Sequence, residues 1–191
     1  MLKKTQIEEF YNVLIYGQYH FPIKADTIKK CVNISYNTIC RAFTKYSSFN
    51  AKKDKNNLID YIVDGIISYP KGYNFNDWHK NMCQSIESKY KLEIGYSQHI
   101  INLTLKYLCC LQVNNGLTLT NIDFDDCHFD ICMPNVRELN NKYKCGIAIS
   151  SLTNIKTYND YVKIQNKINT TMNRVSPKST LIEFECNVWN K

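Results

Sequence analysis

Three polar side chains share one edge of the mainly apolar stretch Gly95–Leu111, whose sequence is GYSQHIINLTLKYLCCL. They are His99, Asn102 and Lys106, and their spacing of three and seven residues puts them on one face of a helix. Burying an imidazole or an amide without a partner costs roughly 1–3 kcal/mol for each group. We therefore expect this polar edge to meet water in a cleft, another polar group or a ligand.

The acidic stretch 121–130, NIDFDDCHFD, is a second source of chemistry. Its candidate ligands for a divalent cation are Asp123, Asp125, Asp126, His128 and Asp130. A calcium loop that starts at Asp123 fails, because His128 stands where the loop needs glycine and Pro134 where it needs the closing carboxylate. Cys127 and His128 are unsuited to act as nucleophile and base, because adjacent residues on a helix point apart. The stretch favours a solvated acidic loop, and we expect no metal and no cofactor.

Taken in order, the two stretches resemble the helix-hairpin-helix DNA glycosylases. That family carries a glycine hairpin that leads into a buried helix, and then a turn with an aspartate at a helix start. Residues 95–102, GYSQHIIN, match the hairpin, and Asp126 in the triplet DCH matches the aspartate. Ser97 replaces the second glycine, His99 replaces the lysine of the bifunctional branch, and the proline before the aspartate is missing. The resemblance covers about residues 77–133.

The resemblance implies a DNA N-glycosylase in which Asp126 and His99 are the catalytic residues. A carboxylate at Asp126, kept ionised at a helix start, would stabilise the positive charge that develops on the sugar. With His99 in the lysine position a Schiff base is not expected, which predicts base excision without strand nicking, or no catalysis. The implied substrate-binding residues are Gly95, Tyr96, Ser97, Gln98, Asn102, Lys106, Trp78, His128 and Phe129. Hairpin N–H groups near Gly95 and Ser97 would hold a phosphate, and Trp78, Tyr96 and Phe129 would line a pocket for a flipped base. The plainer alternatives are a helix cap at Asp126 and a turn at Gly95.

A non-catalytic helical module that binds DNA or a protein partner is the alternative from another functional class. The net charge is +7, and residues 1–60 hold ten Lys and Arg against five Asp and Glu, which favours nucleic acid as a partner. Residues 26–46 resemble a helix-turn-helix with Ser35 as cap of the recognition helix, although the first helix is about one turn short. The alternative is a core helix, with Tyr36, Ile39, Cys40 and Phe43 inward and Arg41 and Lys45 in water.

Nine cysteines without a C-x-x-C pair indicate reduced thiols in the cytoplasm rather than disulfides or a zinc motif. We expect no signal peptide and no membrane span. The helical patterns predict an all-α fold of seven or eight helices around a central buried helix at about 97–113. The chain should form one domain over 1–191, with a possible junction between two small lobes near 47–57, where NAKKDKNN reads as a solvated linker. The other expected helices cover 5–16, 26–46, 58–69, 77–90, 136–139, 157–173 and 179–189, with Asn76 as the cap of 77–90. GIAISSL, 146–152, could be a short strand or a turn.

Overall fold

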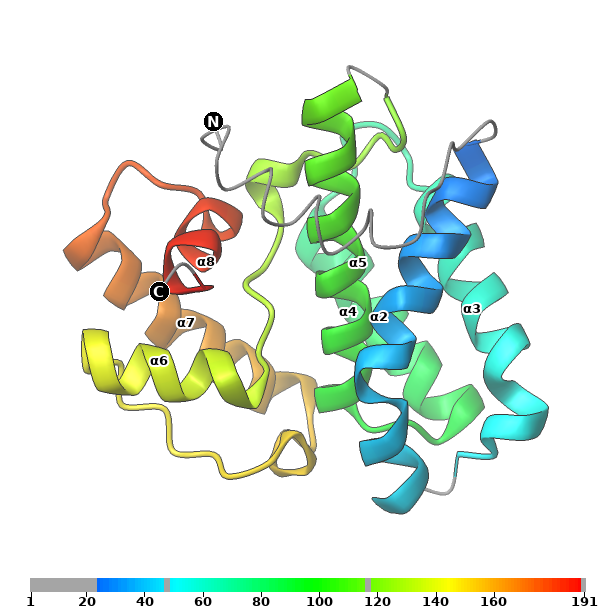
Figure 1. Ribbon diagram of the computed structural model, residues 1–191, viewed down its shortest axis with the longest axis horizontal. Coiled ribbons are helices and arrows are strands. Elements are labelled where there is room, and N and C mark those ends of the chain that lie inside the picture. Colours follow the sequence, from blue (N-terminus) through cyan, green and yellow to red (C-terminus); the bar gives the residue numbers. More distant parts are fainter. Residues whose placement is uncertain (1–23, 47–48, 116–117, 190–191) are drawn as a thin grey trace.

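A computed structural model describes residues 24–46, 49–115 and 118–189 (Figure 1). Over these ranges the protein is all-α, as the sequence predicts, with seven α-helices, two 3-10 turns and no strand. The elements are α2 Lys24–Tyr46, α3 Ala51–Ile67, α4 Phe75–Tyr90, α5 Ile94–Asn115, η1 Phe124–Asp126, α6 Met133–Tyr143, η2 Leu152–Asn154, α7 Tyr158–Val175 and α8 Leu181–Trp189. The helix expected at 5–16 lies outside the described residues.

Helix α5 is the centre of the fold. Its residues from 94 to 111 are all buried, which confirms the prediction of a central buried helix. Helices α2 and α4 pack directly against it, and α3 covers α2 and α4. Figure 1 shows α6, α7 and α8 grouped on the other side of α5. The buried apolar residues form one contiguous cluster that includes both groups of helices.

Capping side chains determine where several helices begin. Asn50 accepts a hydrogen bond from the Lys53 N–H at 3.2 Å, so α3 begins at Ala51. The prediction of a solvated linker here is therefore wrong, because residues 51–57 form the first turns of α3. Asn74, not Asn76, caps α4, and it accepts from the Asp77 N–H at 3.1 Å.

Helix α2 is continuous, so the predicted helix-turn-helix is wrong and the alternative of one core helix holds. No glycine or proline interrupts residues 26–46. Ser35 does not cap a new helix, because its hydroxyl donates to the Cys31 carbonyl one turn earlier, at 3.0 Å. Tyr36 and Ile39 are buried and Arg41 is exposed, as expected for a helix with one face in the core.

Two irregular segments cross the surface of α5. Residues 127–132 run from η1 to α6 in a non-helical conformation, and only His128 among them is more than slightly exposed. Residues 146–152 form no strand and lead into η2, where the Leu152 carbonyl lies so close to Gly95 that a Cβ there would collide with it. Within the described ranges no helix combines the length and the apolar character that a membrane span requires.

Candidate functional site

The polar edge of α5 meets the irregular segment 127–132. The Gln98 amide donates to the Ile131 carbonyl at 2.7 Å and accepts from the Ile131 N–H at 3.3 Å. Asn102 and Gln165 both donate to the Phe129 carbonyl, at 3.3 and 2.6 Å. Buried backbone groups need partners, and this segment has no neighbouring strand to supply them. Gln98 and Asn102 therefore have a structural role, because their side-chain amides supply the hydrogen bonds that a neighbouring strand would otherwise supply to this segment.

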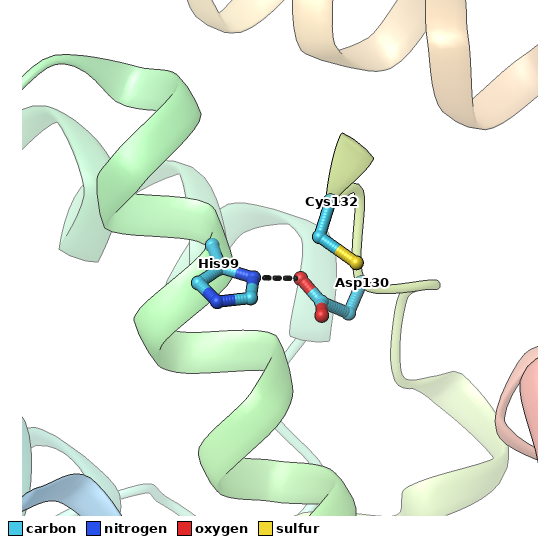
Figure 2. Close-up of side chains that lie close together, drawn as sticks. All are labelled: His99, Asp130 and Cys132. Carbon is cyan, nitrogen blue, oxygen red and sulfur yellow. Dashed lines mark hydrogen bonds and ion pairs between the residues drawn. The ribbon is translucent and has the colours of Figure 1, made fainter. Parts of the chain in front are cut away.

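His99 extends from the same edge toward a carboxylate. Its Nδ1 lies 2.7 Å from Asp130 Oδ1, and its side chain is almost fully buried (Figure 2). Its Nε2 lies 3.2 Å from the Thr38 hydroxyl, which itself donates to the Ser35 carbonyl at 2.6 Å. Because the Thr38 hydrogen is already used, Nε2 carries a hydrogen and donates to Thr38. Nδ1 and Asp130 Oδ1 lie at hydrogen-bond distance, so a hydrogen or a metal ion must lie between them, and either group can carry that hydrogen.

Asp130 belongs to a buried network of charges. Lys106 forms an ion pair with Glu185 and lies 4.0 Å from Asp130 Oδ2, and all three side chains are 1% exposed. Glu185 also accepts from the Asp130 N–H and from the Asn135 amide, both at 3.0 Å. Burial alone would lower the pKa of Lys106, but the Glu185 and Asp130 carboxylates outweigh it and raise that pKa.

A cavity of about 360 Å³ lies beside this network. Its polar part includes His99, Asp130 and Cys132. Its apolar wall comes mainly from Ile39, Ala42, Tyr96, Leu103, Tyr107, Met133 and Leu152. Cavities of this size, with apolar walls and a few polar groups, are typical of sites for small organic ligands.

Cys132 is the third polar group at this end of the cavity. Its sulfur, a ring nitrogen of His99 and a carboxylate oxygen of Asp130 lie within 4.8 Å of one another. Figure 2 shows the sulfur close to the carboxylate that faces the His99 ring. Burial, and then the charge of Asp130, raise the pKa of the Cys132 thiol well above its ordinary value. Without another cation the thiol therefore stays protonated, and it is a poor nucleophile.

A second polar cluster includes His128 of the segment 127–132 and His79, whose rings have centroids 4.8 Å apart. His79 Nδ1 is 2.9 Å from the Tyr158 hydroxyl, and His128 Nδ1 is 2.8 Å from the Tyr161 hydroxyl. The rings of His79 and Tyr161 stack with centroids 5.2 Å apart. Burial is the main cause that lowers the pKa of His79, and it lowers that of His128 to about 4. These two imidazoles are therefore neutral near pH 7.

The structure places Asp126 away from the polar end of the cavity. Its side chain is exposed, and it does not line the cavity that contains His99. The prediction that Asp126 stands at a helix start is wrong, because it ends η1, whose first turn is capped by Asp123. The carboxylate that contacts His99 belongs to Asp130, four residues later.

The residues expected to hold a phosphate have other partners. Gly95, Ser97 and Gln98 lie in the first turns of α5 and are buried. The N–H groups of Tyr96 and Ser97 both donate to the Glu93 carbonyl at 3.0 Å. The turn 91–93 joins α4 to α5 directly before them, and these two N–H groups already have a partner in that turn.

The three aromatic residues expected to surround a flipped base do not share one pocket. Tyr96 lines the cavity described above. Trp78 donates to the Gly65 carbonyl at 3.2 Å in the core between α3 and α4, and Phe129 packs against Phe184 with ring centroids 6.2 Å apart. His128 belongs to the second polar cluster, and Lys106 to the charge network.

Sequence reasoning missed Thr38, Cys132 and Glu185, and it considered Asp130 only as a ligand within an acidic loop. A signal for two of them was present. Asp130 lies between Phe129 and Ile131, and Glu185 lies in the run LIEFECNVW. A carboxylate inside an apolar run must be paired when the run is buried. Lys106, in LTLKYL, is the matching cation.

Comparison of the chain with protein-family models, with curated proteins and with solved structures gives no match.

Proposed function

We propose that the protein is an acid–base enzyme whose cavity binds a small, largely apolar ligand or group. The 2.7 Å contact between His99 and Asp130, at the wall of a cavity of about 360 Å³, carries this proposal. An imidazole oriented by a buried carboxylate is the commonest device for general acid–base catalysis. The apolar walls would confine water to the polar end of the cavity, where one water molecule would add to the substrate in a hydrolysis, and His99 would be the proton carrier.

The position of Thr38 indicates where a ligand would exchange a proton with His99 Nε2. The His99 Nε2–H donates to the Thr38 hydroxyl across 3.2 Å, and Thr38 also lines the cavity. A ligand atom that replaces Thr38 as the partner of Nε2 would give or receive this proton. Asp130 would stay on Nδ1 and stabilise the charged imidazole.

Hydrolysis of an N-glycosidic bond is the specific reaction that we propose, and nucleic acid is the proposed source of the substrate. It needs a carboxylate that stabilises a developing positive charge and a group that moves a proton. Asp130 takes the role that the glycosylase resemblance gave to Asp126, because only Asp130 contacts His99 and lines the cavity. The net charge of +7 would attract the phosphates.

The test is a turnover screen with nucleosides, small glycosides and esters, and duplexes that each carry one damaged base. We expect His99→Gln to lower kcat about 10²- to 10⁴-fold, the usual size of a general acid–base contribution. Ala42→Trp, which fills the cavity, should abolish binding, whereas Asp126→Asn should leave turnover unchanged. Turnover that survives His99→Gln would contradict the acid–base role. Turnover that is lost in Asp126→Asn but kept in Asp130→Asn would assign the catalytic role to Asp126, as the glycosylase resemblance does.

A non-catalytic nucleic-acid-binding module is the second candidate, and the excess of basic residues favours it. It predicts an affinity for DNA that falls steeply with salt and no turnover of any substrate. Binding that is unchanged by His99→Gln and Ala42→Trp would support the module and contradict the enzyme.

A further inference from the structure

We infer that His99, Asp130 and Cys132 form a binding site for one divalent transition-metal ion of the zinc class. The inference rests on the proposed function only in placing the ion at the wall of the same cavity. The three residues offer one nitrogen, one oxygen and one sulfur, all within 4.8 Å of one another. Nitrogen and sulfur donors select zinc and its neighbours over calcium and magnesium.

The distances suit such an ion after small movements. Zinc bonds of about 2.0–2.3 Å at tetrahedral angles place ligand atoms about 3.3–3.8 Å apart. His99 Nδ1 and Asp130 Oδ1 are now 2.7 Å apart, and no pair of the three ligand atoms exceeds 4.8 Å. Shifts of about 1 Å or less would therefore admit the ion. Three protein ligands leave a fourth position open, as catalytic zinc sites require.

The residues that hydrogen-bond to His99 and Asp130 also support a metal site. The Nε2–H of His99 donates to Thr38, which donates to the Ser35 carbonyl, so the Nδ1 lone pair is directed at the cluster. Such an outer hydrogen bond on the second ring nitrogen is the usual support for a histidine ligand. Glu185 accepts from the Asp130 N–H, and Asn135 donates to the Asp130 carbonyl at 2.9 Å, which fixes the position of this residue.

One carboxylate oxygen provides independent support. Asp130 Oδ2 is buried and accepts no hydrogen bond from any described residue. The Lys106 ammonium is 4.0 Å from this oxygen, beyond hydrogen-bond distance, and its closer contact is with Glu185. A buried carboxylate oxygen without a donor is costly, and coordination of a cation would offset that cost.

The charge balance allows the ion to enter. A divalent ion would replace two protons, one between His99 Nδ1 and Asp130 Oδ1 and one on Cys132, so the total charge of the cluster stays the same. A water molecule on the fourth position would face the cavity and take over the role of proton carrier from His99.

The experiment is a titration of the full chain with Co²⁺, after treatment with chelator and under reducing conditions without oxygen. We expect one Co²⁺ per chain, a sulfur-to-cobalt charge-transfer band and the visible bands of tetrahedral cobalt, all removed by Zn²⁺. Cys132→Ser should abolish the charge-transfer band, and Cys145→Ser, a substitution at another buried thiol, should preserve it. Thr38→Val should weaken binding about 10- to 100-fold, because it removes the partner of Nε2.

Absence of Co²⁺ and Zn²⁺ binding by the wild type, or a charge-transfer band that persists in Cys132→Ser, would overturn the inference. Circular dichroism of each variant identifies those that fail to fold, and for these His99→Gln is a second ligand variant with the same expected loss of binding. These readouts need no turnover. Metal binding without turnover would overturn the proposed function alone, and turnover that depends on His99 in a protein that binds neither Co²⁺ nor Zn²⁺ would overturn this inference alone.

Discussion

Two buried imidazole sites each include a residue of the segment 127–132, and they differ in the partners of the ring. His99 is 6% exposed and faces the Asp130 carboxylate, whereas His79 is fully buried and faces the Tyr158 hydroxyl. The first arrangement needs a hydrogen or a metal ion between the imidazole and the carboxylate, and in the second burial lowers the pKa of the imidazole and so favours the neutral ring. Both the burial of a histidine and the chemistry of its nearest partner therefore affect its protonation state.

The hydrogen bonds around His128 require a neutral imidazole ring. The Tyr161 hydroxyl accepts from the Asn102 and Gln165 amides, both at 3.0 Å, so its own hydrogen goes to His128 Nδ1. His128 Nε2 then donates to the Asn76 side-chain oxygen at 2.7 Å. Every position of this ring is used without a second proton.

The largest effect on stability should come from Lys106→Met. This change breaks the charged site, which contains Lys106, Asp130 and Glu185. It leaves intact the imidazole–phenol site, in which His79 and His128 contact Tyr158 and Tyr161. Removing one partner of a buried ion pair leaves carboxylates without a counter-charge, so we expect a loss of about 3–5 kcal/mol of unfolding free energy. Burial already raises the pKa of Glu185 against the attraction of Lys106, so Glu185 should take up a proton in this variant. Urea unfolding at pH 7.5 measures the loss.

Lys163→Met is the matched control. Its side chain is 77% exposed and lies 3.8 Å from Asp160, and such surface pairs contribute about 0–1 kcal/mol. The double variant Lys106→Met with Glu185→Leu should recover part of the loss. Equal stabilities for Lys106→Met and Lys163→Met would show that the buried network contributes little.

The second effect, acid destabilisation, should belong to the imidazole–phenol site. His128 has a folded pKa of about 4 against an unfolded value near 6.5, so the unfolded state binds the proton first as the pH falls. Stability should therefore be lost between about pH 6.5 and pH 4, by roughly 3 kcal/mol for this residue. His128→Asn keeps an acceptor for Tyr161 and does not titrate, so its loss over this range should be smaller by that amount. Thermal melts at several pH values test this, and parallel curves for the two proteins would contradict it.

The third effect is steric, and it should change the His99 site but not the site at His79 and His128. Gly95→Ala drives a methyl group into the Leu152 backbone carbonyl, which cannot turn aside, and overpacking of this kind costs about 1–3 kcal/mol. Leu152 lines the cavity, so ligand or metal binding at His99 should weaken, while the fluorescence of the tyrosines near His79 should not change. In Gly65→Ala the added Cβ meets only the end of the flexible Met82 side chain, at 2.6 Å, so a smaller loss is expected there. A larger loss for Gly65→Ala would contradict this account.

The fold could be predicted from the sequence because local signals agree with it. The row of Trp78, Met82 and Ile86 and the apolar run of α5 each identify a helix, and Thr157 caps α7 where the pattern begins. The errors fell where polar residues are ambiguous. The stretch 50–57 is as polar as a linker, yet a single cap at Asn50 starts a helix there.

The partners within the site could not be predicted, because they come from segments far apart in the chain. The polar edge of α5 indicates that His99 and Lys106 need partners, but it does not identify them. Asp130 is 31 residues from His99, and Glu185 is 79 residues from Lys106. The acidic stretch holds several carboxylates, and only the path of the segment 127–132 shows which one turns inward.

The smallest effect on stability should come from Thr38→Val, which removes one hydrogen bond at the His99 site and leaves the site at His79 and His128 unchanged. Thr38 is exposed, so losing the hydrogen bond to His99 Nε2 should lower the unfolding free energy by about 1 kcal/mol or less. In ¹⁵N spectra the wild-type His99 ring should carry a hydrogen on Nε2, the nitrogen that donates to Thr38. In Thr38→Val the Nε2 hydrogen should exchange faster with water, while the contact between Nδ1 and Asp130 stays in place. A wild-type His99 whose Nε2 carries no hydrogen would be inconsistent with this hydrogen bond.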